Sequence, residues 1–166
     1  YDYKEYEYDT RAGGSGGSMR AMAFGTYLWK PEQRLLLIET VIETTTITHP
    51  NAIAYLGAIA VALFTSYAIQ GLAPEQWHIQ MMDVMESDVI NEYIQETREK
   101  TFPHFLKDKK LFINKWKDYI EERFTEHNSY KKSMIMKYPS KRSAFYNKFS
   151  SKKKEMYPGA GGDDSA

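Results

Sequence analysis

One long uncharged stretch constrains the fold of this chain more than any other feature. Residues 47–72, ITHPNAIAYLGAIAVALFTSYAIQGL, contain no charged side chain, whereas the sequence on either side is much more polar. A stretch of this length and apolarity either spans a membrane or forms a helix buried on all sides in a globular domain. Its nearest charges are Glu43 and Glu75, and the flanking lysines and arginines typical of a membrane span are missing. We therefore expect a buried core helix and no membrane contact.

Signals for a helix start and a helix end delimit this core helix. Thr48 and Pro50 are residue types that favour a helix start, and Gly71 followed by Pro74 favours a helix end. Alanines and Gly57 between these ends let neighbouring helices approach closely. The sequence therefore predicts a central helix that begins near Thr48 and ends at Gly71.

Composition narrows the class of protein. The 166 residues include 22 basic and 22 acidic side chains, so the net charge gives no global attraction to nucleic acid or to a membrane. Cysteine is absent, which excludes disulfides, cysteine-ligated zinc and cysteine nucleophiles, and fits a reducing, cytoplasmic location. The chain starts at Tyr1 instead of methionine, and we expect it to be a piece of a longer protein.

The remaining sequence predicts further helices and hence an all-α helical bundle. Candidate helices cover residues 31–46, 74–85, 89–100 and 109–124. We expect Pro103 to end the third of these and Asp108 to cap the fourth. Residues 1–10, YDYKEYEYDT, are compatible with an edge strand or with a disordered lead-in, and no strand alternation stands out after them. In the helix at 31–46, one face is expected to be buried: Leu35, Leu36, Ile38 and Ile42.

A glycine-rich run, GGSGGS at residues 13–18, has two interpretations. It could be a flexible linker. It could also be a phosphate-binding loop, in which glycines let successive backbone N–H groups converge on an anion at a helix N-terminus. The residues of the run do not by themselves decide between the two.

Two further positions are candidates for binding chemistry. His49 stands at the N-terminal entry to the core helix, where a helix dipole favours neutral imidazole and attracts anions; it could equally bond a nearby carbonyl. None of the four histidines has a histidine partner at helical metal-ligand spacing. Asp163 and Asp164 could ligate magnesium through oxygen or could belong to a solvated tail.

The segment 130–154 is strongly basic and includes aromatic residues. Such interleaving can bind nucleic acid through phosphate charges and base stacking. A solvated, lysine-rich surface is the other interpretation, and we prefer it because no recognition motif accompanies the charges. We therefore expect no nucleic-acid partner.

The order of these signals resembles the ADP-ribosylglycohydrolase family, and within it the ADP-ribosylarginine hydrolase branch. The resemblance consists of GGSGGSMRAM, then FGTYLWKP and a helix, then Thr48-His49, then YLGA at residues 55–58, at the spacing found in that branch. It covers residues 13–77 well and becomes patchy afterwards. It favours the binding-loop interpretation, because a linker would not reproduce the spacing downstream.

The resemblance implies a partial ADP-ribosylglycohydrolase-like helical domain at residues 13–166, preceded by a lead-in at 1–12. It further implies hydrolysis of the N-glycosidic bond between ADP-ribose and arginine, with magnesium as cofactor and ADP-ribose or an ADP-ribosylated protein as ligand. Arg20 is expected to hold the loop through hydrogen bonds instead of contacting ligand. The implied ADP-ribose-binding residues are Gly13, Gly14, Ser15, Gly16, His49, Tyr157, Gly159, Gly161 and Gly162.

The sequence departs from the family pattern at its metal motifs. Nothing before Gly13 resembles the acidic Thr-Asp-Asp cluster of the family. The terminal YPGAGGDDSA corresponds either to the family's adenosine segment or to an altered metal motif with Asp163 and Asp164 as ligands. We therefore assign no catalytic residue and expect this chain alone to be inactive. A non-catalytic structural or ADP-ribose-binding module is the alternative.

Overall fold

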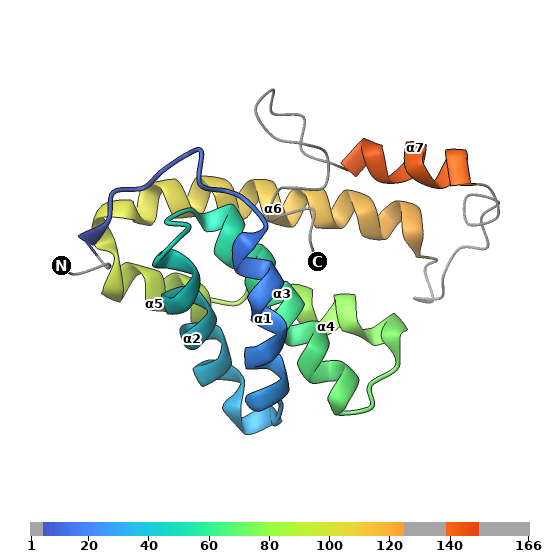
Figure 1. Cartoon of the computed structure of the whole chain (residues 1–166), viewed down its shortest axis with the longest axis horizontal. Coiled ribbons are helices and arrows are strands. Elements are labelled where there is room, and N and C mark those ends of the chain that lie inside the picture. Colours follow the sequence, from blue (N-terminus) through green and yellow to red (C-terminus); the bar gives the residue numbers. More distant parts are fainter. Residues whose placement is uncertain (1–4, 125–138, 150–166) are drawn as a thin grey trace.

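A computed structural model describes residues 5–124 and 139–149 of the chain. These residues form helices joined by short connections, with no β-strand in either described range (Figure 1). The all-α prediction is therefore confirmed. In chain order the elements are α1 (Gly16–Tyr27), the 3-10 turn η2 (Pro31–Gln33), α2 (Arg34–Thr46), α3 (Ala52–Ile69), α4 (Pro74–Glu86), α5 (Val89–Thr97), the 3-10 turn η3 (Glu99–Thr101), α6 (Phe102–Arg123) and α7 (Pro139–Phe149).

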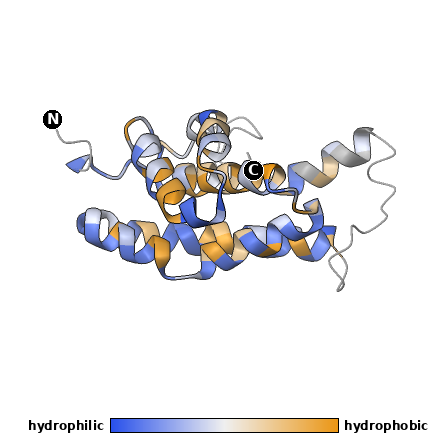
Figure 2. Cartoon of the chain, turned by 90° about the horizontal axis from the view of Figure 1, so that it is seen from below, coloured by the Kyte–Doolittle hydropathy of each residue, from blue (hydrophilic) through white to orange (hydrophobic). Residues whose placement is uncertain are grey.

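Helix α3 is the core of the molecule, as its composition predicts. It is long and apolar enough to cross a membrane, yet 67% of its residues are buried inside the fold. The neighbouring helices cover it, and they carry hydrophilic residues on part of their surfaces (Figure 2). The helix ends as expected at Gly71, whose φ of 75° suits glycine. The N–H of Leu72 then bonds to the carbonyl of Tyr67 and closes the last turn.

The closest helix contact in the fold joins α1 to α3. At Gly25 of α1, an added Cβ would lie 2.3 Å from the carbonyl oxygen of Ala62 and 2.8 Å from Cβ of Thr65. The backbones of the two helices therefore touch at this point, which only a residue without a side chain allows. The contact fixes the position of α1, and with it the glycine-rich loop that precedes the helix.

Two predicted helix starts are wrong. Helix α3 begins at Ala52, and its cap is Asn51, whose side chain accepts from the N–H of Ile53 at 2.9 Å. Helix α6 begins at Phe102, so Pro103 lies in its first turn, where the missing N–H costs nothing. Asp108 is consequently inside α6 and caps nothing. Its carboxylate accepts a hydrogen bond from Tyr8, a partner 100 residues away that sequence patterning does not reveal.

The predicted buried face of α2 is partly wrong. Ile38 and Ile42 are buried as expected, together with Leu37 and Val41. Leu35 and Leu36 are 53% and 52% exposed. The buried face is centred near Val41, and at 100° per residue Leu35 and Leu36 lie about 120° and about 140° away from Val41 around the helix, so both face away from the core.

The segment before the loop, at residues 5–12, is tied to the start of α3. The hydroxyl of Tyr8 accepts from the N–H of Ala52 at 2.9 Å, and the amide of Asn51 donates to the carbonyl of Asp9 at 2.9 Å. Tyr8 also stacks on His104 of α6. These contacts, and no strand pairing, hold the segment against α3 and α6; residues 1–4 lie outside the described ranges.

The basic segment predicted at 130–154 is described only at α7. Two of its aromatic side chains, Phe145 and Phe149, pack on Tyr119 of α6 with ring centroids 6.2 Å and 5.4 Å away. Packing on α6 therefore occupies part of the aromatic surface that base stacking would need. The absence of a nucleic-acid partner stays a prediction.

Candidate functional site

The glycine-rich loop leads directly into α1. Ser15 occupies the cap position without a side-chain hydrogen bond, and the N–H of Met19 bonds to its carbonyl at 3.1 Å. The first amides of a helix have no acceptor within the helix and carry its positive partial charge. No acidic side chain lies in the first turn of α1 to offset that charge. The loop thus brings a helix start that attracts anions to the surface of the core.

His49 lies against this helix start. An added Cβ on Gly16 would be 2.7 Å from Cε1 and 2.8 Å from Nε2 of the His49 ring. An added Cβ on Gly17 would be 2.5 Å from Cγ2 of Thr45. Side chains at these two positions would displace the end of α2 and the turn that follows it, so the glycines permit the contact between loop and histidine. The short turn between α2 and α3 holds the ring in place.

Gly13, at the N-terminal end of the loop, also lies close to the turn between α2 and α3. An added Cβ there would lie 3.2 Å from Oδ1 of Asn51, the cap of α3. The loop therefore runs along the α2–α3 turn from Asn51 to His49, with Gly14 and Ser15 between the two contacts. The structure brings together all five predicted binding residues that it describes: Gly13, Gly14, Ser15, Gly16 and His49.

Arg20 connects α1 to the turn that carries His49. Its Nη2 donates to the carbonyl of Thr44 at 2.9 Å and to Oγ1 of Thr48 at 2.5 Å. Oγ1 of Thr48 in turn lies 2.7 Å from Nδ1 of His49. Burial lowers the pKa of His49, and the charge of Arg20 lowers it further. A neutral imidazole is therefore favoured at this position.

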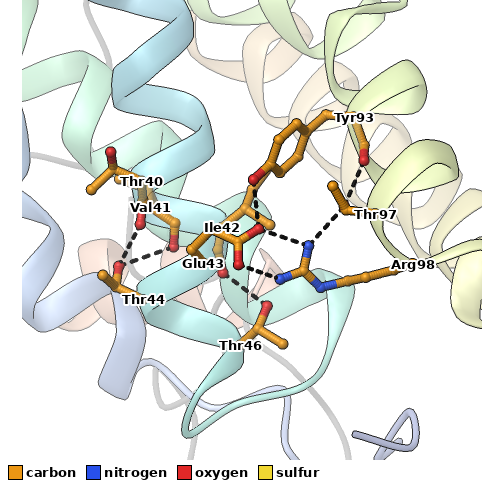
Figure 3. A network of polar contacts seen from close by, with 9 residues as sticks. All are labelled: Thr40, Val41, Ile42, Glu43, Thr44, Thr46, Tyr93, Thr97 and Arg98. Carbon is orange, nitrogen blue, oxygen red and sulfur yellow. Dashed lines mark hydrogen bonds and ion pairs between the residues drawn. The ribbon is translucent and has the colours of Figure 1, made fainter. Parts of the chain in front are cut away.

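A second polar cluster, absent from the sequence predictions, stabilises the C-terminal end of α2, near Thr44. The guanidinium of Arg98, after α5, bonds to the carboxylate of Glu43, which also accepts from the hydroxyl of Tyr93 at 2.6 Å (Figure 3). Glu43 directly precedes Thr44, the acceptor of Arg20. One signal could have revealed the cluster: Arg98 follows the apolar Ile94 by four residues within the helix predicted at 89–100, so it is expected on the apolar face of that helix, where a cation needs a buried partner.

A groove of ≈ 640 Å³ lies elsewhere, between the segment at residues 5–8 and the connection from α5 to α6. None of the predicted ADP-ribose-binding residues lines it. Its lining includes the acidic residues Glu5, Glu7, Glu96 and Glu99 and the basic residues Arg98 and Lys100.

The remaining predicted site residues lie outside the described ranges. They are Tyr157, Gly159, Gly161 and Gly162 of the adenosine segment, and Asp163 and Asp164 as magnesium ligands. Within residues 5–124 and 139–149, no three histidine, aspartate or glutamate side chains gather closely enough to hold a metal ion. The described residues therefore do not fit a magnesium centre, and both assignments stay predictions.

Comparison with known proteins identifies the family to which this chain is related. The family model described as ADP-ribosylglycohydrolase matches residues 2–143, which include the loop, His49 and helices α1 to α6. This chain belongs to the ADP-ribosylglycohydrolase family. The family resemblance inferred from the sequence is thereby confirmed.

Two relatives illustrate the extent of the similarity. The ADP-ribosylhydrolase ARH1 of Dictyostelium discoideum is 39% identical over 127 residues, which are 74% of this chain and 32% of that protein. The "Putative ADP-ribosyl glycohydrolase" of Acanthamoeba polyphaga mimivirus is 30% identical over 163 residues, which are 98% of this chain and 31% of that protein. The chain thus spans about a third of the length of these ADP-ribosylglycohydrolase relatives.

Proposed function

We propose that this chain forms part of the ADP-ribose-binding site of a hydrolase that cleaves the N-glycosidic bond between ADP-ribose and arginine. The observation that carries the proposal is the contact of Gly16 with His49, which places the ring nitrogen Nε2 beside a helix start whose cap residue makes no side-chain hydrogen bond. Family membership and the similarity to an ADP-ribosylhydrolase support it. The assignment of arginine as the acceptor rests on the sequence resemblance to one branch of the family.

The chemistry of ADP-ribose suits such a site. Its diphosphate presents several anionic oxygens, which backbone amides at a helix N-terminus bind well. Glycines at the contact points let those oxygens approach the main chain without interference from side chains. A neutral histidine adds a directed donor without the cost of desolvating a second charge.

The reaction itself needs groups beyond the described residues. In the complete protein, magnesium would polarise ribose oxygens and activate water. Because the described residues do not fit a magnesium centre, we derive no catalytic step from them. We expect the 166-residue chain to bind ADP-ribose without hydrolysing ADP-ribosyl-arginine.

Calorimetric titration of ADP-ribose into the purified chain tests the binding. We expect micromolar affinity, and a loss of roughly tenfold in His49→Ala, because one hydrogen bond to a charged acceptor is removed. Thr26→Ala is the matched control, since Thr26 is an exposed residue near the other end of α1 whose hydroxyl bonds only to the carbonyl of Met22. Absence of binding by a chain whose circular dichroism shows intact helices would overturn the proposal.

Assays of hydrolysis separate the proposed enzyme from the non-catalytic alternative. The chain alone should release no ADP-ribose from ADP-ribosyl-arginine with or without magnesium, and release would contradict our expectation. The complete parent protein should release it in a magnesium-dependent reaction. Tight binding without any hydrolysis by the parent would favour a binding module.

A further inference from the structure

We propose that Arg20 and Thr48 are positioning residues that hold His49 as a neutral imidazole with its proton on Nε2. This inference deepens the proposed function and rests on it, because it assigns His49 the role of a hydrogen-bond donor toward the anionic oxygens of ADP-ribose. Neither residue is required to touch the ligand. Both act through the His49 ring.

The hydrogen bonds around Thr48 determine where its proton goes. Its oxygen accepts from Nη2 of Arg20 at 2.5 Å, and an arginine can only donate. The hydroxyl proton then has two possible acceptors, the carbonyl of Thr45 at 3.5 Å and Nδ1 of His49 at 2.7 Å. The first distance is at the limit of a hydrogen bond, whereas the second is near optimal. Thr48 therefore donates to Nδ1, which must carry a lone pair.

A lone pair on Nδ1 leaves the ring proton of neutral His49 on Nε2. The opposite tautomer would make Nδ1 a donor to Thr48, and the hydroxyl proton would have only the distant carbonyl of Thr45. Doubly protonated imidazolium would meet the same obstacle and would also face the charge of Arg20. The lowered pKa of His49, caused by burial and then by Arg20, agrees with this assignment.

The donor that results is placed where the ligand is expected. Nε2 lies 2.8 Å from the position that a Cβ on Gly16 would occupy, at the first residue of α1. Within the described residues, no group forms a hydrogen bond with Nε2. The ring N–H is thus available beside the amides of the helix start, and the two can bind the same anionic group.

Nuclear magnetic resonance of the chain with ¹⁵N-labelled histidine tests the tautomer directly, without ligand. The His49 signals are assigned by their loss in His49→Gln. We expect Nδ1 to resonate as an unprotonated nitrogen and Nε2 as a protonated one. Thr48→Val should shift both resonances toward a mixture of tautomers, whereas Thr48→Ser should preserve the pattern. Thr26→Val, the same substitution at an exposed site of α1, should change neither resonance.

The role of Arg20 is tested by the pKa of His49 in the same spectra. Arg20→Met should raise this pKa, because it removes the positive charge beside the ring. Arg11→Met is the matched control: Arg11 is an exposed arginine just before the loop that pairs with Asp9 and does not act on the pKa of His49. An unchanged pKa in Arg20→Met would refute the role given to Arg20. A protonated Nδ1 in the unsubstituted chain would overturn the proposal entirely.

Titration of ADP-ribose then separates this inference from the proposed function. Thr48→Val should bind roughly fivefold more weakly, the loss expected for one misdirected hydrogen bond, and Thr48→Ser should restore affinity. If the tautomer changes but the affinity does not, the positioning role is refuted while ADP-ribose binding stands. If the tautomer is as described but the unsubstituted chain binds no ADP-ribose, the proposed function fails and with it the role of His49 toward the ligand.

Discussion

Glu43 and Arg98 are 55 residues apart in the chain and form a bidentate ion pair. Nη1 of Arg98 donates to Oε1 of Glu43 at 3.0 Å, and Nη2 donates to Oε2 at 2.9 Å. The side chain of Arg98 is 4% exposed and that of Glu43 is 18% exposed. The pair joins the last turn of α2 to the residue that follows α5 (Figure 3). Helix α2 ends at Thr46, three residues before His49. The ion pair holds in place the part of α2 to which Arg20 binds.

Breaking this ion pair should strongly destabilise the fold. In Arg98→Met the carboxylate of Glu43 keeps only its bond from Tyr93 among the partners that Figure 3 draws, and we expect the free energy of unfolding to fall by about 3 kcal/mol. Urea denaturation measures the loss. Lys117→Met is the matched control, because Lys117 pairs with Glu86 at a site 58% and 45% exposed, where such pairs contribute about 0–1 kcal/mol. Equal losses in both variants would contradict the prediction.

Tyr8→Phe should loosen the N-terminal segment from the core. The substitution removes the bond to Asp108 and the acceptor for the N–H of Ala52, so we expect a loss of about 1–2 kcal/mol in unfolding free energy. Hydrogen exchange should locate the effect, with faster exchange at Ala52. Tyr6→Phe, in the same segment at 36% exposure, should have little effect. A stability of Tyr8→Phe equal to that of the unsubstituted chain would show that these bonds contribute nothing net.

Gly25→Ala should destabilise the protein, although the same change in an ordinary helix usually stabilises by about 0.5–1 kcal/mol. The added Cβ would lie 2.3 Å from the carbonyl of Ala62, so α1 and α3 must separate, at a cost of about 1–3 kcal/mol. Thermal denaturation should show a lower Tm. The neighbouring Thr26→Ala, an exposed change on the same helix, provides the comparison. A raised Tm in Gly25→Ala would mean that the close helix contact is wrong.

The stability of the fold should depend on the protonation of His49. Burial and the charge of Arg20 lower its pKa in the folded chain, whereas the unfolded chain has the ordinary value of about 6.5. In the window just below about pH 6.5 the unfolded chain therefore binds more protons, so stability rises with pH there and falls as the solution is acidified. His49→Gln should show a flatter dependence of unfolding free energy on pH between about 5 and 7. Identical slopes would contradict the lowered pKa.

The predictable parts of the fold are those with strong local signals. The apolar stretch predicts α3 and its burial, because a helix that is apolar on all sides must be buried in the core. Gly71 marks the end of this helix. Helix starts were less predictable. Asp108 looked like a cap because it precedes an amphipathic run, but its carboxylate pairs with Tyr8, and no local pattern encodes a partner 100 residues away.

The candidate site was predictable in part because some of its residues also give local sequence signals. Gly13, Gly16 and His49 stood out by residue type and by their order along the chain, although only the fold shows that an added Cβ on Gly16 would meet the His49 ring. Arg20 was expected to hold the loop. In the structure it bonds to the carbonyl of Thr44 in α2 and to the hydroxyl of Thr48 in the turn that follows, because α1 lies beside the end of α2.

The sequence by itself determined that this chain is helical, that a helix within the uncharged stretch 47–72 lies at its centre, and that it belongs with the ADP-ribosylglycohydrolases. Hydrophobicity, glycine and proline positions and residue order act over short stretches, so they can be read along the chain. The tertiary structure alone decided which polar groups meet: Arg20 with Thr48, Tyr8 with Asp108, and Glu43 with Arg98. Such pairs form only when packed helices bring distant residues within hydrogen-bonding distance.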